Sequence, residues 1–150
     1  IYFILLVLFV LLALGGFYRI QEKKIAAISP LVTIGAKTYF IEIANSDASR
    51  EKGLSGRKML NEDSGMLFIF STPNQYGFWM KDTLIPLDMI WIGEDKHIVH
   101  IEKNVLPESY PTLYSPEEDA LYVLELNAGE VEKNFFAVGD QVSIFLPESH

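Results

Sequence analysis

The stretch Phe78–Ile92, FWMKDTLIPLDMIWI, is the part of the sequence that says most about the fold. Its two halves meet at Pro86, and each half has the length and apolar content of a buried β-strand. Three charged residues, Lys81, Asp82 and Asp88, interrupt the apolar run. The stretch therefore predicts two strands, and it raises the question of what these three charges contact.

The regions on both sides of this stretch also have strand patterns. Leu31–Ala44 alternates apolar and polar residues around Gly35-Ala36, which predicts a hairpin with a tight turn. The turn residues Gly93–Lys96 predict a second hairpin. Further strands are expected at 65–70, 97–103, 121–126 and 141–146, and a turn-rich connection at 71–77.

Two short helices complete the expected elements. The segment Asn45–Leu60 begins with residues that favour helix N-caps, of which Asp47 is our choice, and Gly53 limits its length. A helical turn is expected at 127–135. Seven or eight short strands with two short helices indicate a mainly β domain, either an antiparallel β-sandwich of jelly-roll type or a small barrel, over residues 31–150.

The N-terminal region has a different character. Ile1–Tyr18 contains no charged residue, and a bilayer core requires about 20 mostly apolar residues in a spanning helix. We expect a retained transmembrane anchor at residues 1–18 and a juxtamembrane linker at 19–30. The alternative is a signal segment, for which Ala13-Leu14-Gly15 is the only small-x-small triplet near the end of the run.

The cations that follow the apolar run bear on orientation. Arg19, Lys23 and Lys24 would hold the domain in the cytoplasm under the positive-inside rule. A leader rich in Lys and Arg before Ile1 would reverse that expectation. The sequence on its own leaves both orientations open.

Composition excludes several classes of function. The 150 residues include no cysteine, so disulfides, thiolate metal sites and cysteine nucleophiles are excluded. All charges follow residue 18, and the formal net charge of −8 disfavours binding to nucleic acid or to anionic lipid surfaces. Walker and dinucleotide-binding glycine motifs are absent, so no cofactor is expected.

A metal site is not expected either. His97 and His100 are three residues apart, and on a regular strand such residues point to opposite faces. The acidic group Pro116–Asp119 lacks the alternating ligand spacing of a calcium-binding loop. A solvated acidic loop explains it better.

Two carboxylates fall on apolar faces of expected strands. In Leu87–Ile92 the alternation places Asp88 with Ile90 and Ile92, and in Leu121–Leu126 it places Glu125 with Leu121 and Val123. A buried unpaired carboxylate costs several kcal/mol or becomes protonated. Asp88 and Glu125 therefore require partners.

Two interpretations of these charges compete. In the first, Arg57 or Lys81 neutralises Asp88 in a buried pair that fixes strand register. In the second, several polar and aromatic residues converge in a cleft that binds a small ligand. The candidate ligand-binding residues are Arg57, Trp79, Lys81, Asp82, Asp88, Trp91 and Glu125.

Five ordered segments resemble one known family. They are REKGLSGR, GMLFIF, FWMKDTLIPLDMIWI, YVLELNAG and VGDQV, and together they resemble the envelope-associated family called domain of unknown function 192. Asp82 replaces the asparagine usual in that family, and Ser55 replaces the usual methionine. The resemblance implies a small β domain of jelly-roll type behind a signal or anchor, and hence an extracytoplasmic domain. It implies no activity and no catalytic residue.

Three functional hypotheses follow. The first is a membrane-tethered module of the cell envelope that binds a small ligand without catalysis. The second is a small lyase, isomerase or hydrolase in which Asp88 is the acid/base and Arg57 or Lys81 holds an anionic group. The third is a structural partner of another membrane protein, with the proline-rich loop Leu106–Asp119 as the contact.

Overall fold

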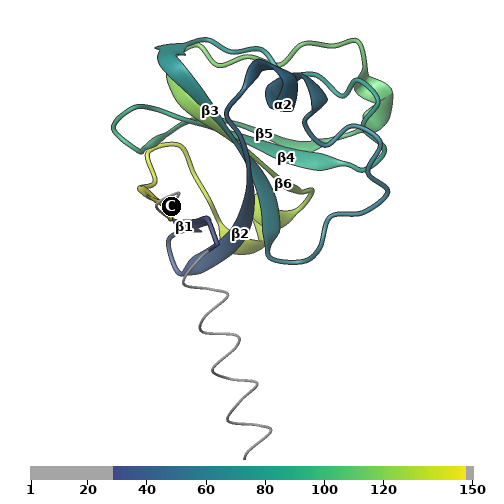
Figure 1. The fold of residues 1–150 in the computed structure, drawn as a ribbon. Helices are drawn as coiled ribbons and strands as arrows, with labels where there is room; N and C mark the ends of the chain where they lie inside the picture. The colour runs from purple at the N-terminus through teal and green to yellow at the C-terminus, as the bar shows by residue number, and fades with distance from the viewer. Residues whose placement is uncertain (1–28, 148–150) are drawn as a thin grey trace, which may run out of the picture. The chain divides into compact units, whose positions relative to one another are not determined.

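The computed structural model describes residues 29–147, in which seven strands form one curled sheet (Figure 1). The sheet order is β5-β4-β6-β3-β2-β1-β7. The strands are β1 (Leu31–Ile34), β2 (Lys37–Ala44), β3 (Ser64–Asn74), β4 (Leu87–Ile92), β5 (Ile98–Val105), β6 (Ala120–Asn127) and β7 (Val142–Phe145). The helical elements are α2 (Asp47–Lys52), α3 (Glu130–Asn134) and the 3-10 turn η1 (Pro107–Ser109).

The two outer strands of the sheet approach each other at one end. A bridge joins His97 to Gln141, and the amide of Val142 donates to the carbonyl of Lys96 at 2.8 Å. The mainly β prediction is therefore confirmed in the form of one sheet curled into a half-barrel. The alternative of a two-sheet sandwich is wrong for the described residues.

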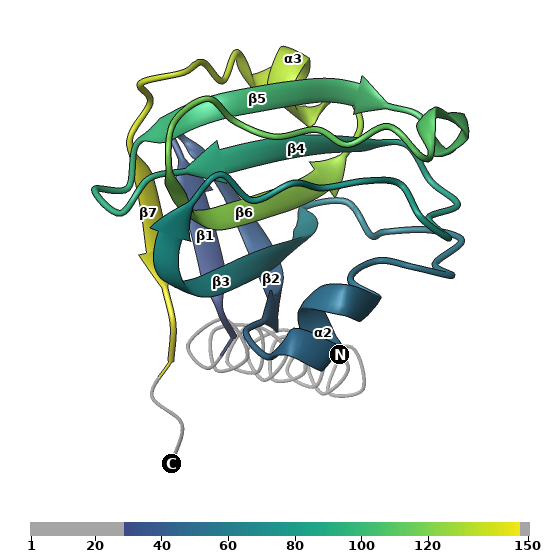
Figure 2. The same ribbon diagram turned by 90° about the horizontal axis from the view of Figure 1, so that it is seen from above.

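One strand pair departs from the antiparallel prediction. β2 and β3 are parallel, with Phe40 opposite Ser64 and Ala44 opposite Phe68. The chain leaves the end of β2, forms α2, and returns along a loop to the end where β2 began. This crossover allows parallel pairing, and it places α2 beside β2 and β3 on one side of the sheet, away from α3 (Figure 2).

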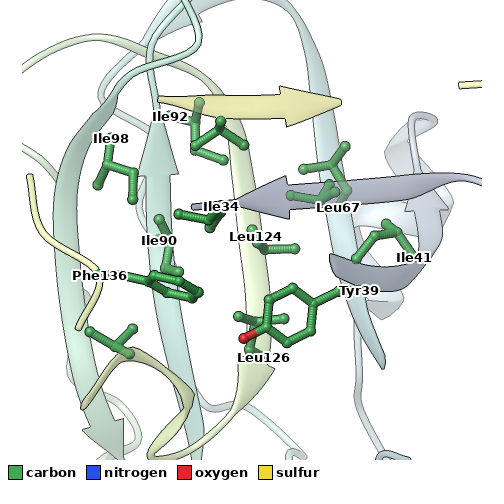
Figure 3. Close-up of a cluster of buried hydrophobic side chains, with 13 residues drawn as sticks. Ile34, Tyr39, Ile41, Leu67, Ile90, Ile92, Ile98, Leu124, Leu126 and Phe136 are labelled. Atoms are coloured by element: carbon green, nitrogen blue, oxygen red, sulfur yellow. The ribbon is translucent and has the colours of Figure 1, made fainter. Parts of the chain in front are cut away.

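The sheet separates two hydrophobic clusters. The inner cluster lies inside the curl, and Figure 3 shows its side chains converging from β1 to β6. The outer cluster covers the opposite face of β3, β4 and β6, beneath α2 and the segment 76–86. Because alternate residues of a strand point to opposite faces, Ile90 and Ile92 of β4 belong to the inner cluster, and Met89 and Trp91 belong to the outer cluster.

The predicted hairpin and the predicted first helix are both present. Gly35 has φ of 57° between β1 and β2, the conformation for which a glycine was expected. Helix α2 begins one residue earlier than expected, because Ser46 is the N-cap in place of Asp47. The hydroxyl of Ser46 accepts from the amide of Ser49, and the hydroxyl of Ser49 accepts from the amide of Ser46, which forms a capping box.

The first half of Phe78–Ile92 is not a strand. Among the described residues, Phe78 makes only an isolated bridge, to Tyr114, and the chain turns at Lys81 and Asp82. Asp82 has φ of 55°, which a regular strand does not allow. In contrast, β3 continues to Asn74, through part of the region where turns were expected.

The predicted anchor at residues 1–18 and most of the predicted linker lie outside the described residues. Within residues 29–147, no helix has both the length and the apolar character needed to span a membrane.

Candidate functional site

Asp88 is fully buried, but neither Arg57 nor Lys81 is its partner. Its Oδ1 accepts a hydrogen bond from the amide of Asn104 at 2.8 Å, and its Oδ2 accepts from the amide of Val131 at 2.8 Å. Backbone amides can stabilise a buried carboxylate without a cation. The predicted ion pair that fixes strand register is therefore wrong, whereas the predicted inward orientation is correct.

The two amides bonded to Asp88 belong to irregular backbone. Asn104 has φ of 53° and lies where the pairing of β4 with β5 shifts register, so its amide is available for a side chain. Val131 is in the first turn of α3, whose N-cap Gly129 provides no side-chain hydrogen bond. Asp88 thus joins a bulge on β5 to the beginning of α3, and its role is structural.

Arg57 is also paired elsewhere. Its guanidinium forms a two-bond ion pair with the carboxylate of Glu42 on β2. This pair lowers the pKa of Glu42 and raises the pKa of Arg57. Arg57 therefore has its charge matched by a neighbour on the sheet, and it does not line the cavity described below.

A cavity of about 740 Å³ lies on the outer face of the sheet. Four of the seven candidate residues line it: Trp79, Lys81, Asp82 and Glu125. Arg57, Asp88 and Trp91 do not; Trp91 is fully buried and donates from Nε1 to the carbonyl of Tyr76 at 2.8 Å. The other lining residues are Asp47, Ala48, Arg50, Glu51, Lys52, Gly53, Leu54, Ser55, Phe68, Phe70, Tyr76, Gly77, Phe78 and Thr83.

Glu125 is the most unusual residue of this cavity. It lies on the central strand β6 between Met66 of β3 and Met89 of β4, and only 5% of it is exposed. Its carboxyl group makes no hydrogen bond or ion pair with any described residue. Burial among apolar neighbours raises its pKa to about 8, so at neutral pH the group is mostly protonated.

Polar groups of the cavity wall come from two loops. The hydroxyls of Ser55 and Thr83 both donate to the carbonyl of Lys81, at 3.1 and 3.4 Å. Gly56 donates from its amide to the carbonyl of Asp82 at 2.8 Å. These bonds hold the loop after α2 against the turn at Lys81 and Asp82, and they shape this side of the cavity.

Aromatic rings form much of the remaining wall. Phe70 stacks on Tyr76 at a centroid separation of 3.5 Å, and Phe78 packs edge-on against Phe68. Trp79 is 49% exposed and meets the edge of Tyr110, from the loop Leu106–Asp119, at 5.8 Å. The proline-rich loop therefore reaches an aromatic residue of the cavity.

Sequence reasoning missed the contribution of α2 and the loop that follows it. Asp47, Arg50, Ser55 and Thr83 line the cavity but were not candidates. Their segments were visible in the sequence as a helix start and as parts of the resembling segments, but nothing local shows that they face Glu125. In residues 29–147 no three His, Cys, Asp or Glu residues form a group able to hold a metal ion.

Comparison with known proteins gives a family and a fold. The family model DUF192, described as "Uncharacterized ACR", matches residues 31–144. None of the curated proteins matches the chain.

Two solved structures are similar to the domain. One is a Sinorhizobium meliloti 1021 protein described as a "putative transcription regulator", with 35% identity, a TM-score of 0.73, and coverage of 77% of this chain and 92% of that chain. Another is a protein of unknown function from Novosphingobium aromaticivorans DSM 12444, with 33% identity, a TM-score of 0.71, and coverage of 77% and 83%. At this similarity the curled sheet is common to the three proteins.

Proposed function

The chain belongs to the DUF192 family, and from the geometry of its cavity we propose that the domain is a small-ligand-binding module of the cell envelope. The observation that supports this most is the carboxyl group of Glu125 in the cavity wall, which has no hydrogen-bond or ion-pair partner within residues 29–147. A buried polar group without a hydrogen bond reduces stability. A ligand that provides the missing partner would offset this cost, so a binding role explains why the group is there.

The proposed location follows from the N-terminal sequence. Ile1–Tyr18 is long and apolar enough for a membrane anchor, and the linker 19–30 would separate it from the domain. We propose that the domain is tethered in this way on the extracytoplasmic side of the membrane. Alkaline phosphatase fused after Pro147 should then be active, whereas activity of a cytoplasmic reporter fused there would contradict this orientation.

A small enzyme is the second candidate, with Glu125 rather than Asp88 as the acid/base. Both oxygens of Asp88 are occupied by amides, and the residue is fully buried. Glu125 instead has a pKa near 8 in an accessible cavity, which suits proton transfer at neutral pH. Turnover of a bound compound that is lost in Glu125→Gln, with binding retained, would favour the enzyme.

Trp79→Ala tests the binding module. We expect it to weaken ligand binding about tenfold, because a half-exposed ring at the cavity contributes contact area to the ligand. The free energy of unfolding should change by less than about 1 kcal/mol. Binding is measured on the full chain by saturation-transfer NMR with a mixed set of sugars, amino acids, amines, nucleosides and carboxylic acids, and stability is measured by urea denaturation.

Phe145→Ala is the matched control, because Phe145 is 48% exposed and lies on β7, outside the cavity. It should leave binding unchanged. If no compound of the set gives a signal that Trp79→Ala reduces, the binding module is wrong. A large loss of stability in Trp79→Ala would instead make Trp79 a core residue.

A further inference from the structure

We infer that the ligand of this cavity is an uncharged molecule rich in hydroxyl groups, that is, a saccharide. The inference rests on the proposed binding function and narrows its chemistry. It follows from the charge balance of the cavity, from the hydrogen-bonding groups of its wall, and from the aromatic rings beside them.

The charges that line the cavity cancel. The lining includes three cationic side chains, from Arg50, Lys52 and Lys81, and three anionic ones, from Asp47, Glu51 and Asp82. Met66 and Met89, which flank Glu125 on the sheet, have no charge. With the carboxyl group of Glu125 protonated, the lining has no net formal charge. Such a wall gives no electrostatic preference to an anion or a cation.

Two of the three cations differ in their surroundings, because Arg50 is hydrogen-bonded and Lys81 is exposed. Arg50 donates from Nη1 to the carbonyl of Ile69 at 2.7 Å and from Nη2 to Asp47 at 2.6 Å. Lys81 lies with its Nζ 6.0 Å from the ring centroid of Trp79 and is exposed to solvent. Neither cation affects the pKa of Glu125, which is set by burial alone. A charged ligand would therefore find no buried counter-charge until Glu125 ionised.

The hydrogen-bonding groups match a hydroxyl-rich ligand. A protonated carboxyl group both donates and accepts, as a sugar hydroxyl does. The hydroxyls of Ser55 and Thr83 donate to the carbonyl of Lys81, so their oxygens can serve only as acceptors towards a ligand. A ligand can therefore either donate a hydrogen bond to Glu125 or accept one from it, and it must donate to the hydroxyl oxygens of Ser55 and Thr83.

The aromatic rings of the cavity wall provide apolar surface for the C–H face of a sugar. A pyranose ring has an apolar C–H face, which packs against the electron-rich face of an aromatic ring, and polar hydroxyls at its edge. Tyr76, Phe78 and Trp79 lie in the wall that also contains Glu125, whereas the ring of Phe70 is covered by Tyr76 and by the guanidinium of Arg50. The volume of 740 Å³ is within the range of about 300–1,000 Å³ typical of small-molecule sites.

Binding of defined saccharides to the full chain tests the inference. The chain is kept in a polyoxyethylene detergent, which has no sugar headgroup to compete. Glucose, N-acetylglucosamine, maltotetraose and chitotetraose are titrated by calorimetry, with choline and acetate as charged probes of similar or smaller size. Affinity that is equal for a monosaccharide and its tetramer indicates a free sugar as ligand, and tighter binding of the tetramer indicates a glycan chain.

Variants at Glu125 test whether its carboxyl group takes part in saccharide binding. In the wild type, saccharide affinity should fall about tenfold from pH 6.5 to pH 9.5, because ionised Glu125 no longer donates. Glu125→Gln keeps a donor and an acceptor, so it should bind within about threefold of wild type at pH 6.5 and show no such fall. Glu125→Leu should lose about tenfold or more at pH 6.5.

Each other outcome overturns the inference. Choline binding that exceeds saccharide binding and strengthens as pH rises would show that ionised Glu125 selects a cation. Acetate binding above that of the saccharides would show an anion site. If no saccharide binds, the inference that the ligand is a saccharide is wrong. The proposed binding function is then decided separately, by the mixed compound set and the effect of Trp79→Ala.

Discussion

Asp88→Ala should lower the free energy of unfolding by about 3–5 kcal/mol, because it leaves two buried amides without an acceptor. Those amides belong to Asn104 and Val131, and each lies 2.8 Å from a carboxylate oxygen in the native protein. The loss affects two elements at once, since the bulge of β5 and the first turn of α3 share this one side chain. Urea denaturation at pH 7 measures the change.

Asp88→Asn removes the charge of the side chain while keeping nearly the same shape. Its amide oxygen can replace one acceptor, but its NH₂ group would face the other backbone amide, so we expect a loss of about 2–3 kcal/mol. Asp119→Asn is the control, because Asp119 is exposed just before β6, and it should change stability by less than about 0.5 kcal/mol. An Asp88→Ala protein as stable as the control would show that Asp88 has no structural role.

Replacing Glu125 should have the opposite effect on stability. Its pKa is about 8 in the folded protein, against the ordinary value of 4.5. Between these values the folded protein keeps a proton that the unfolded chain has lost, so the contribution of Glu125 to stability is fully present below pH 4.5 and is lost as the pH rises through about 8. The full difference amounts to about 5 kcal/mol.

Glu125→Leu removes this dependence. The difference in unfolding free energy between wild type and Glu125→Leu should shift in favour of the variant as pH rises from 4.5 to 8.5, and at pH 8.5 the variant should be more stable by about 3 kcal/mol. Denaturation curves at five pH values measure this difference. Glu117→Gln, an exposed change, controls for general charge effects. Parallel pH profiles of wild type and Glu125→Leu would show that Glu125 has an ordinary pKa.

Alternation along the strands was enough to predict which carboxylates are buried. Because β4 and β6 are central strands with apolar residues on both faces, any charge within them must be buried, and Asp88 and Glu125 are 0% and 5% exposed. The hairpins were also predictable, because the turn at Gly35 requires a left-handed backbone that glycine adopts easily.

The partners of Asp88 were not predictable from residue types. A search for cations suggested Arg57 and Lys81, but Asp88 bonds only backbone amides, which every residue except proline has. The prediction that all seven candidate residues converge in one cleft was also wrong. Asp88 is in line with the inner face of β4, whereas Glu125 lies on the outer face of β6, so the sheet itself separates them.

The turn at Lys81 and Asp82 was missed because the residues on both sides of it are apolar. Phe78 and Met80 do point towards the outer cluster, as a strand would direct them. The backbone carbonyls of Lys81 and Asp82, however, bond to the loop after α2, and the backbone of Phe78 bonds to Tyr114, so the segment joins no strand of the described sheet. Side-chain periodicity reports burial, and the pairing of the backbone depends on contacts between distant segments.

The meeting of β5 and β7 at His97 and Gln141 has a consequence for self-association. An open edge strand can recruit a strand from another molecule and begin aggregation. Here the described sheet ends in β7, which has four residues, and in β5, which has a bulge at Asn104 and a charged pair of neighbours in Glu102 and Lys103. Short length, irregular backbone and charge each oppose strand addition. The curl therefore leaves little regular edge on which a second copy could extend the sheet.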